Sequence, residues 1–156
     1  MSDDVKDRLD IVELALKWSA AASRMDARGL GQIFTEHGVL AGVAKLAPGW
    51  GQDDLIGPKA IEGFFSEIFT GLSFVHHTSQ VVELEVRGDV ANCRTMIVEY
   101  ARLKTGNLLV VIGDYLDQMA RTPQGWRFTR RELVTKAWTF LSEIPTATFH
   151  SGVPAA

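Results

Sequence analysis

The stretch His77–Trp138 reads HTSQVVELEVRGDVANCRTMIVEYARLKTGNLLVVIGDYLDQMARTPQGWRFTRRELVTKAW. Apolar and polar residues alternate through most of it, and turn sequences interrupt the alternation at Gly88-Asp89, Thr105-Gly106-Asn107 and Thr122–Gly125. Alternation with a period of two is typical of strands that bury one face. The stretch therefore predicts a meander of four antiparallel strands, at His77–Arg87, Val90–Lys104, Leu108–Arg121 and Trp126–Trp138.

Three segments upstream of the meander have the spacing of amphipathic helices. Apolar residues recur at helical intervals from Val5 to Met25, which predicts a long first helix. Asp26 is suited to cap a short second helix over Ala27–Phe34, since its side chain can accept from amides two or three residues on. A third helix is predicted from Pro58 to about Gly71.

The order of these segments predicts the fold class. Between the second and third helices, Val39–Leu46 is expected to form an edge strand and Ala47–Gly57 a polar loop that carries Trp50. Three helices followed by four long strands predict an α+β fold, because a curved, mainly antiparallel sheet must bury one face against the helices. We expect a cone-shaped α+β barrel that encloses a cavity.

Length and composition predict one domain over residues 1–156, with residues 141–156 as a tail. The chain has 156 residues and is 46% hydrophobic and 22% charged, which suits one ordinary globular domain. Its formal charge of −3 gives no reason to expect nucleic acid or an anionic membrane as a partner. Cys93 is the only cysteine, so an intrachain disulfide is excluded, and a cytoplasmic location is expected.

Three stretches carry a resemblance to a known family. They are Arg24-Met25-Asp26, Val75-His76-His77-Thr78, and Gly113–Asp117 taken together with Gly125-Trp126-Arg127. In this order they resemble the SnoaL-like branch of the nuclear transport factor 2-like superfamily, over most of residues 8–140. The branch includes scytalone dehydratase, hexachlorocyclohexane dehydrochlorinase and ketosteroid isomerase relatives.

The resemblance implies a catalytic pair of Asp26 and His77. In the dehydratase and the dehydrochlorinase, an aspartate at the end of the first helix pairs with a histidine at the start of the first long strand. A neutral imidazole oriented by a carboxylate suits proton abstraction from carbon. Two other interpretations stay open: Asp26 caps a helix and does nothing else, or His77 is a histidine of the core.

The resemblance also implies which side chains line the cavity. Glu99, Val111, Tyr115 and Arg131 are expected to face it, with Tyr115 or Arg131 holding a substrate oxygen or a departing anion. Glu99 would need a partner such as Arg131, or would have a raised pKa and act as a general acid. The expected apolar lining comprises Trp18, Phe65, Phe69, Leu72, Val75 and Trp138, which favours an apolar or aromatic substrate.

These residues favour a cofactor-independent lyase or isomerase of dehydratase type, in which His77 and Asp26 take a proton from an apolar cyclic small molecule. No metal site and no cofactor are expected, because the histidines lack metal-ligand spacing and no glycine-rich phosphate motif occurs. Two alternatives remain: a non-catalytic ligand-binding or subunit-assembly module, and an epoxide hydrolase or cyclase. Apolar residues on the outer sheet face predict a homodimer or a higher homo-oligomer.

Overall fold

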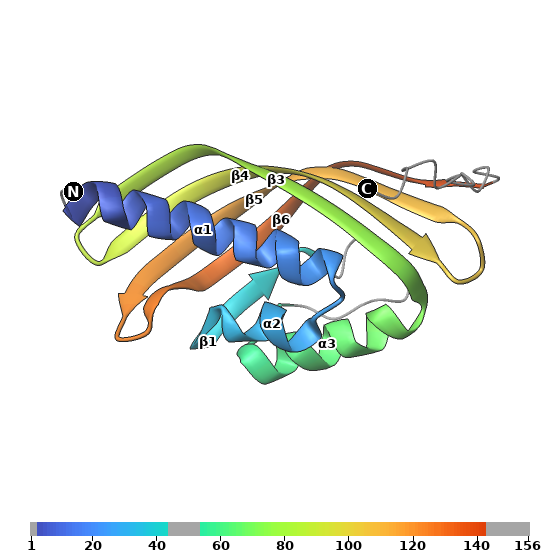
Figure 1. The fold of residues 1–156 in the computed structure, drawn as a ribbon, viewed down its shortest axis with the longest axis horizontal. Helices are drawn as coiled ribbons and strands as arrows, with labels where there is room; N and C mark the ends of the chain where they lie inside the picture. Colours follow the sequence, from blue (N-terminus) through green and yellow to red (C-terminus); the bar gives the residue numbers. More distant parts are fainter. Residues whose placement is uncertain (1–2, 44–53, 143–156) are drawn as a thin grey trace, which may run out of the picture.

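The computed structural model describes residues 3–43 and 54–142. Three helices and six strands follow one another along the chain (Figure 1). In chain order they are α1 (Asp3–Ser23), α2 (Ala27–Gln32), β1 (Phe34–Ala41), β2 (Leu55–Ile56), α3 (Pro58–Thr70), β3 (Leu72–Arg87), β4 (Val90–Leu103), β5 (Leu108–Thr122) and β6 (Gly125–Leu141). No helix among the described residues is long and apolar enough to cross a membrane.

All six strands belong to one sheet, in the order β2-β1-β6-β5-β4-β3. The pairs from β3 to β6 are antiparallel, and β1 joins β6 in parallel. Figure 1 shows the sheet curving over the helices, and α1 lies along β3. The expected α+β class is confirmed. The sheet is mixed and open, with β2 and β3 at its two edges, so it does not close into a barrel.

The three predicted helices are present, and the differences lie at the ends of strands. Phe34 begins β1, where the sequence predicted the end of a helix, because β1 pairs with β6 from Phe34 opposite Phe128 onward. The first long strand begins at Leu72, five positions before the alternation becomes regular. Most of the predicted loop, Trp50 included, and nearly all of the predicted tail lie outside the described residues.

Alternate residues of the long strands face opposite sides of the sheet. On the concave side, Ile97 and Val111 are 3% and 1% exposed. Their chain neighbours Met96 and Ile112, on the convex side, are 47% and 45% exposed. The helices therefore cover one face of the sheet only, and the core lies between that face and the helices.

Candidate functional site

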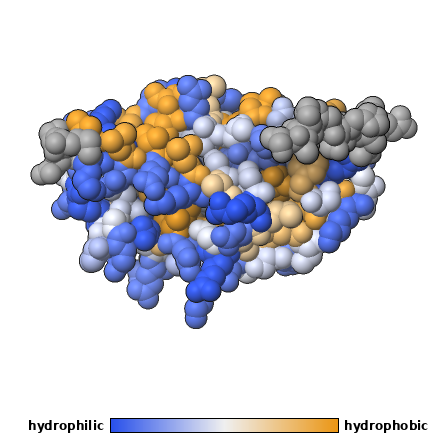
Figure 2. Space-filling model, in the orientation of Figure 1, coloured by the Kyte–Doolittle hydropathy of each residue, from blue (hydrophilic) through white to orange (hydrophobic). Residues whose placement is uncertain are grey.

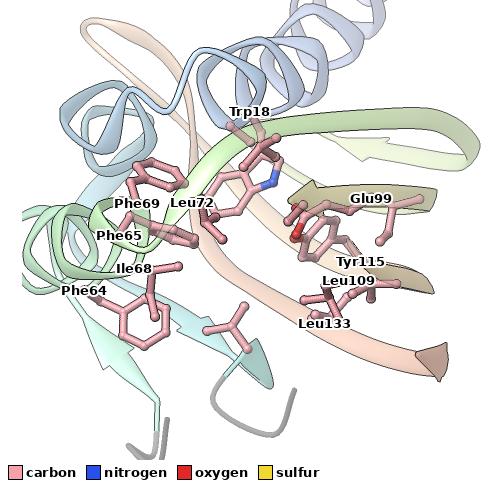
Figure 3. Close-up of a pocket in the computed structure, with 16 residues that line it drawn as sticks. Trp18, Phe64, Phe65, Ile68, Phe69, Leu72, Glu99, Leu109, Tyr115 and Leu133 are labelled. Atoms are coloured by element: carbon pink, nitrogen blue, oxygen red, sulfur yellow. The ribbon is translucent and has the colours of Figure 1, made fainter. Parts of the chain in front are cut away.

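A cavity lies between the concave face of the sheet and the helices α1 and α3 (Figure 3). The cavity is small: about 40 Å³ is open to the centre of a water molecule, within about 640 Å³ free of protein atoms that includes open solvent at its mouth. Among the residues that the structure describes, the lining is apolar apart from the polar groups of Trp18, Glu99 and Tyr115. The lining residues are Trp18, Ala22, Val43, Phe64, Phe65, Ile68, Phe69, Leu72, Val75, Ile97, Glu99, Ala101, Leu109, Val111, Tyr115 and Leu133.

Glu99 is the carboxyl group on this wall. It lies on β4, directly opposite His77 on β3 and Val111 on β5. The apolar surroundings penalise its charged form, and this desolvation raises the pKa of Glu99 to about 7. A carboxyl group with that pKa exchanges its proton readily at neutral pH, which is the property that a general acid or base needs.

His77 is buried beside the cavity, outside its lining. Its backbone N–H donates to Ser23 Oγ at 3.0 Å, and its Nδ1 lies 3.0 Å from Ser19 Oγ. Its Nε2 is buried without a hydrogen-bond partner among the described residues. The ring stacks on Tyr115 with centroids 6.0 Å apart. Burial lowers the pKa of His77 to about 3, with further contributions from Arg131 and His76, so the imidazole is neutral.

Asp26 does not hold His77 in this structure, contrary to the expected pair. Its carboxylate accepts a hydrogen bond from the Gly29 backbone N–H at 2.8 Å and caps α2. A Cβ at position 29 would lie 2.4 Å from Asp26 Oδ2, so glycine leaves room for this cap. The interpretation of Asp26 as a helix cap accounts for its contacts, and the hydroxyl of Ser19 on α1 partners the imidazole.

Arg131 was expected to hold a substrate oxygen, and the structure places it beneath the cavity wall. The side chain is fully buried, and its Nε lies 3.0 Å from Asp117 Oδ1. Its guanidinium carbon lies 4.0 Å from the centroid of Tyr115, 4.4 Å from that of Phe128 and 4.9 Å from that of Trp18. Arg131 therefore supports the wall from behind, because its charge is already paired and its surface is covered by rings.

The structure places the remaining expected lining residues on the wall, with one exception. Trp138 is 44% exposed and is not part of the lining. It lies near the end of β6, paired with Phe140 in a T-shaped contact, beyond the part of the sheet that the helices cover. The expectation for Trp138 is therefore wrong.

Sequence reasoning missed two kinds of site residue. Ser19 and Ser23 are one helical turn apart on α1 and both reach His77; two hydroxyls at this spacing on a buried helix face were an available signal. Phe64 and Ile68 lie on the predicted apolar face of α3 and also line the cavity. No group of three His, Cys, Asp or Glu side chains within residues 3–43 and 54–142 is arranged to hold a metal ion.

The fold is that of a one-sheet α+β protein with an apolar cavity between the sheet and the helices. The chain belongs to the SnoaL-like family, whose domain model matches residues 3–132. A search of functionally curated proteins finds no match.

Solved structures with the same fold include proteins with different enzyme names. One is assigned as an aromatic ring hydroxylase of Novosphingobium aromaticivorans, with 25% identity, a TM-score of 0.74, and coverage of 88% of this chain and 94% of that one. Another is assigned as a scytalone dehydratase of the same species, at 20% identity, TM-score 0.77, and coverage of 90% and 91%. A hexachlorocyclohexane dehydrochlorinase of type 2 is 16% identical, with TM-score 0.81 and coverage of 95% and 97%.

The Asp26 cap on α2 and the contact of Ser19 with His77 predict different effects for two alanine substitutions. Asp26→Ala removes a helix cap and should lower the free energy of unfolding by about 1 kcal/mol, as measured by urea denaturation. It should leave the ¹⁵N resonances of the His77 ring unchanged. Ser19→Ala should shift the Nδ1 resonance, because it removes the partner of that atom. If Asp26→Ala shifts Nδ1 as far as Ser19→Ala does, the assignment of Asp26 as a cap alone is wrong.

Proposed function

We propose that this protein is a cofactor-independent lyase or isomerase that moves a proton on an apolar cyclic small molecule held in the cavity. The observation that carries the proposal is Glu99, a carboxyl group in an apolar wall with a pKa of about 7. As a carboxylate it takes a proton from a carbon next to a carbonyl group, and the C–H electron pair enters an enolate. The proton then returns to another carbon, or a leaving group departs with an electron pair.

Glu99 suits the role of the base better than His77, the residue that was expected to be the base from the family resemblance. A base works best with a pKa near the working pH, and the pKa of His77 is lowered to about 3. Glu99 lines the cavity, whereas His77 lies behind the wall. His77 remains the second candidate, because its Nε2 has no partner in the described part of the chain.

The lining supports an apolar ring as the substrate. Aromatic side chains of α1 and α3 face aliphatic side chains of the sheet across the cavity (Figure 3), and such walls stabilise a flat apolar ligand by excluding water from it. The dehydrochlorinase that shares this fold carries a chlorinated carbocycle in its name, and family membership favours lyase or isomerase chemistry.

A non-catalytic ligand-binding or subunit-assembly module is the second candidate. The bond from His77 to Ser19, in place of a carboxylate, favours it, because a hydroxyl does not strengthen the imidazole as a base. The epoxide hydrolase or cyclase alternative needs Glu99, Asp26 and Arg131 around one water molecule. Asp26 caps α2 and Arg131 pairs with Asp117, so no observation favours that alternative.

Proton exchange into a bound ketone tests the proposal. The probe is 1-tetralone in D₂O at pH 7, with loss of the α-proton signal followed by NMR. We expect the protein to accelerate exchange over buffer, and Glu99→Gln to reduce that acceleration by roughly a hundredfold or more, since a positioned acid or base contributes on that order. Glu67→Gln, which changes an exposed carboxyl group on α3, is the matched control.

Two results would contradict this assignment. If 1-tetralone binds without faster exchange, the non-catalytic module replaces the enzyme. If His77→Asn abolishes the exchange and Glu99→Gln retains it, the base is His77.

We also propose that a second copy of the chain covers the convex face of the sheet. Met96, Tyr100, Ile112, Leu116 and Val134 are each between 39% and 47% exposed on the outward side of β4, β5 and β6. Figure 2 shows apolar residues, interrupted by hydrophilic ones, along the upper edge of the molecule, where the sheet of Figure 1 is seen edge-on. Apolar side chains gathered on one face are typical of protein interfaces.

Light scattering after size exclusion tests this interface. We expect the mass of at least two chains of 17.2 kDa each. Ile112→Lys should reduce this mass to that of one chain, because a charge at the centre of the face opposes burial. Leu9→Lys is the matched control, since Leu9 is an exposed leucine on α1. A single-chain mass for the unaltered protein, or dissociation by Leu9→Lys alone, would contradict the proposed surface.

A further inference from the structure

Two serine hydroxyls connect the buried ring of His77 to the surface of the protein. The Oγ of Ser19 on α1 lies 3.0 Å from His77 Nδ1 and 2.6 Å from the Oγ of Ser79 on β3. Ser19 and His77 are 8% and 5% exposed, whereas Ser79 is half-buried. We call Ser19 and Ser79 the hydroxyl chain. Because a hydroxyl group can accept one proton and donate another, such a chain can pass a proton along its length.

The outer end of the hydroxyl chain lies in a groove between α1 and β3. Figure 1 shows these two elements side by side. Ser79 lines the groove together with Val12 and Leu16 of α1, and the groove is open to solvent. Water in the groove can therefore take a proton from the Ser79 hydroxyl or give one to it.

The inner end is His77 Nε2, behind the wall of the cavity. This atom is buried and has no hydrogen-bond partner within residues 3–43 and 54–142. Glu99 lies directly opposite His77 on the neighbouring strand, and such opposite side chains have Cβ atoms about 4.5–5.5 Å apart. The flexible side chain of Glu99 can carry its carboxyl group across that gap. The unpaired ring nitrogen is thus within reach of the proposed acid–base group.

The buried contacts determine which ring nitrogen of His77 carries the proton. A proton on Nε2 would be a buried donor without an acceptor, which costs free energy. A proton on Nδ1 is donated to Ser19 Oγ, and Ser19 in turn donates to Ser79. The neutral ring therefore has its lone pair on Nε2. Because burial lowers the pKa of His77 to about 3, the ring passes a proton from one nitrogen to the other and does not store it as an imidazolium ion.

We propose that His77 and the hydroxyl chain carry protons between Glu99 and solvent. This inference rests on the proposed function, in which Glu99 takes a proton from the ligand. The carboxyl proton of Glu99 moves to Nε2 of the ring while the Nδ1 proton moves to Ser19. The Ser19 proton moves to Ser79, and the Ser79 proton moves to water in the groove. Each bond to hydrogen that breaks is matched by one that forms, so Glu99 becomes a carboxylate again. The reverse passage returns a solvent proton to Glu99 and restores the first tautomer.

Two isosteric substitutions at Ser79 test the hydroxyl chain. Ser79→Thr keeps the hydroxyl, and Ser79→Val replaces it by a methyl group that leaves no room for a water molecule in its place. Both new residues suit a strand. The measurement is the rate at which the His77 ring N–H exchanges with water, from saturation transfer in ¹⁵N NMR spectra. Ser79→Val should slow this exchange by roughly tenfold or more relative to Ser79→Thr, because the proton then leaves only when the structure opens locally.

Ser23→Ala is the matched control. Ser23 also lies on α1 and also contacts His77, but its Oγ accepts from the backbone N–H at 3.0 Å and does not contact the ring. This substitution should leave the exchange of the ring N–H unchanged. In the unaltered protein, the ¹⁵N chemical shifts of the two ring nitrogens should place the proton on Nδ1.

Three results would overturn the inference. They are equal exchange rates of the ring N–H in Ser79→Val and Ser79→Thr, a ring proton on Nε2, and a slowing in Ser23→Ala as large as that in Ser79→Val.

Exchange of the α-protons of 1-tetralone in D₂O at pH 7 separates this inference from the proposed function. Ser79→Val should lower the acceleration by roughly tenfold relative to Ser79→Thr at unchanged affinity, because Glu99 then returns the same proton to the ligand. If both variants accelerate exchange equally, the enzyme assignment stands and the relay falls. If the unaltered protein gives no acceleration, the proposed function falls, and the exchange rates of the ring N–H still decide whether the hydroxyl chain carries protons.

Discussion

The buried ion pair of Arg131 and Asp117 supports the wall of the cavity. The guanidinium connects α1, β5 and β6, because it packs against Trp18, Tyr115 and Phe128 while its charge is compensated by Asp117. Burial raises the pKa of Asp117 to about 6, and the charge of Arg131 opposes this rise. Because the pKa is still below 7, the carboxylate is charged at neutral pH. Removing one partner would leave a buried charge alone, at a cost of about 3–5 kcal/mol.

The structural ion pair of Arg131 and Asp117 is thus separate from Glu99, the proposed acid–base group. The Arg131 guanidinium lies behind the aromatic rings and is fully buried. Within residues 3–43 and 54–142, Glu99 is therefore the one carboxyl group on the cavity wall, and its neighbours there are apolar. With a cation beside it on the wall, Glu99 would have a low pKa and would be a weak base. The apolar wall is therefore both the proposed binding surface for a ring and the reason that the pKa of Glu99 lies near neutral pH.

The sequence predicted the helices and the meander because both depend on local periodicity. Glu99 and Tyr115 lie on the same face of the sheet and line the cavity, as the family resemblance implied. The periodicity of the sequence could not predict the partner of His77. An aspartate at position 26 can cap a helix or pair with an imidazole, and which of the two occurs depends on how α1 packs on β3. The same packing brings Ser19 to His77. The position of Arg131 likewise depends on packing between three elements, and one side chain on a strand gives no local sign of it.

We propose that the apolar cavity gives Glu99 the acid–base behaviour of a catalytic group. The most direct measurement is a ¹³C NMR titration of the glutamate carboxyl groups between pH 3 and pH 10, with Glu99 identified by the signal missing from Glu99→Gln. A midpoint near 7 for that signal is the result expected from the desolvation of this side chain. A midpoint near 4.3, the value of a glutamate in water, would contradict the claim.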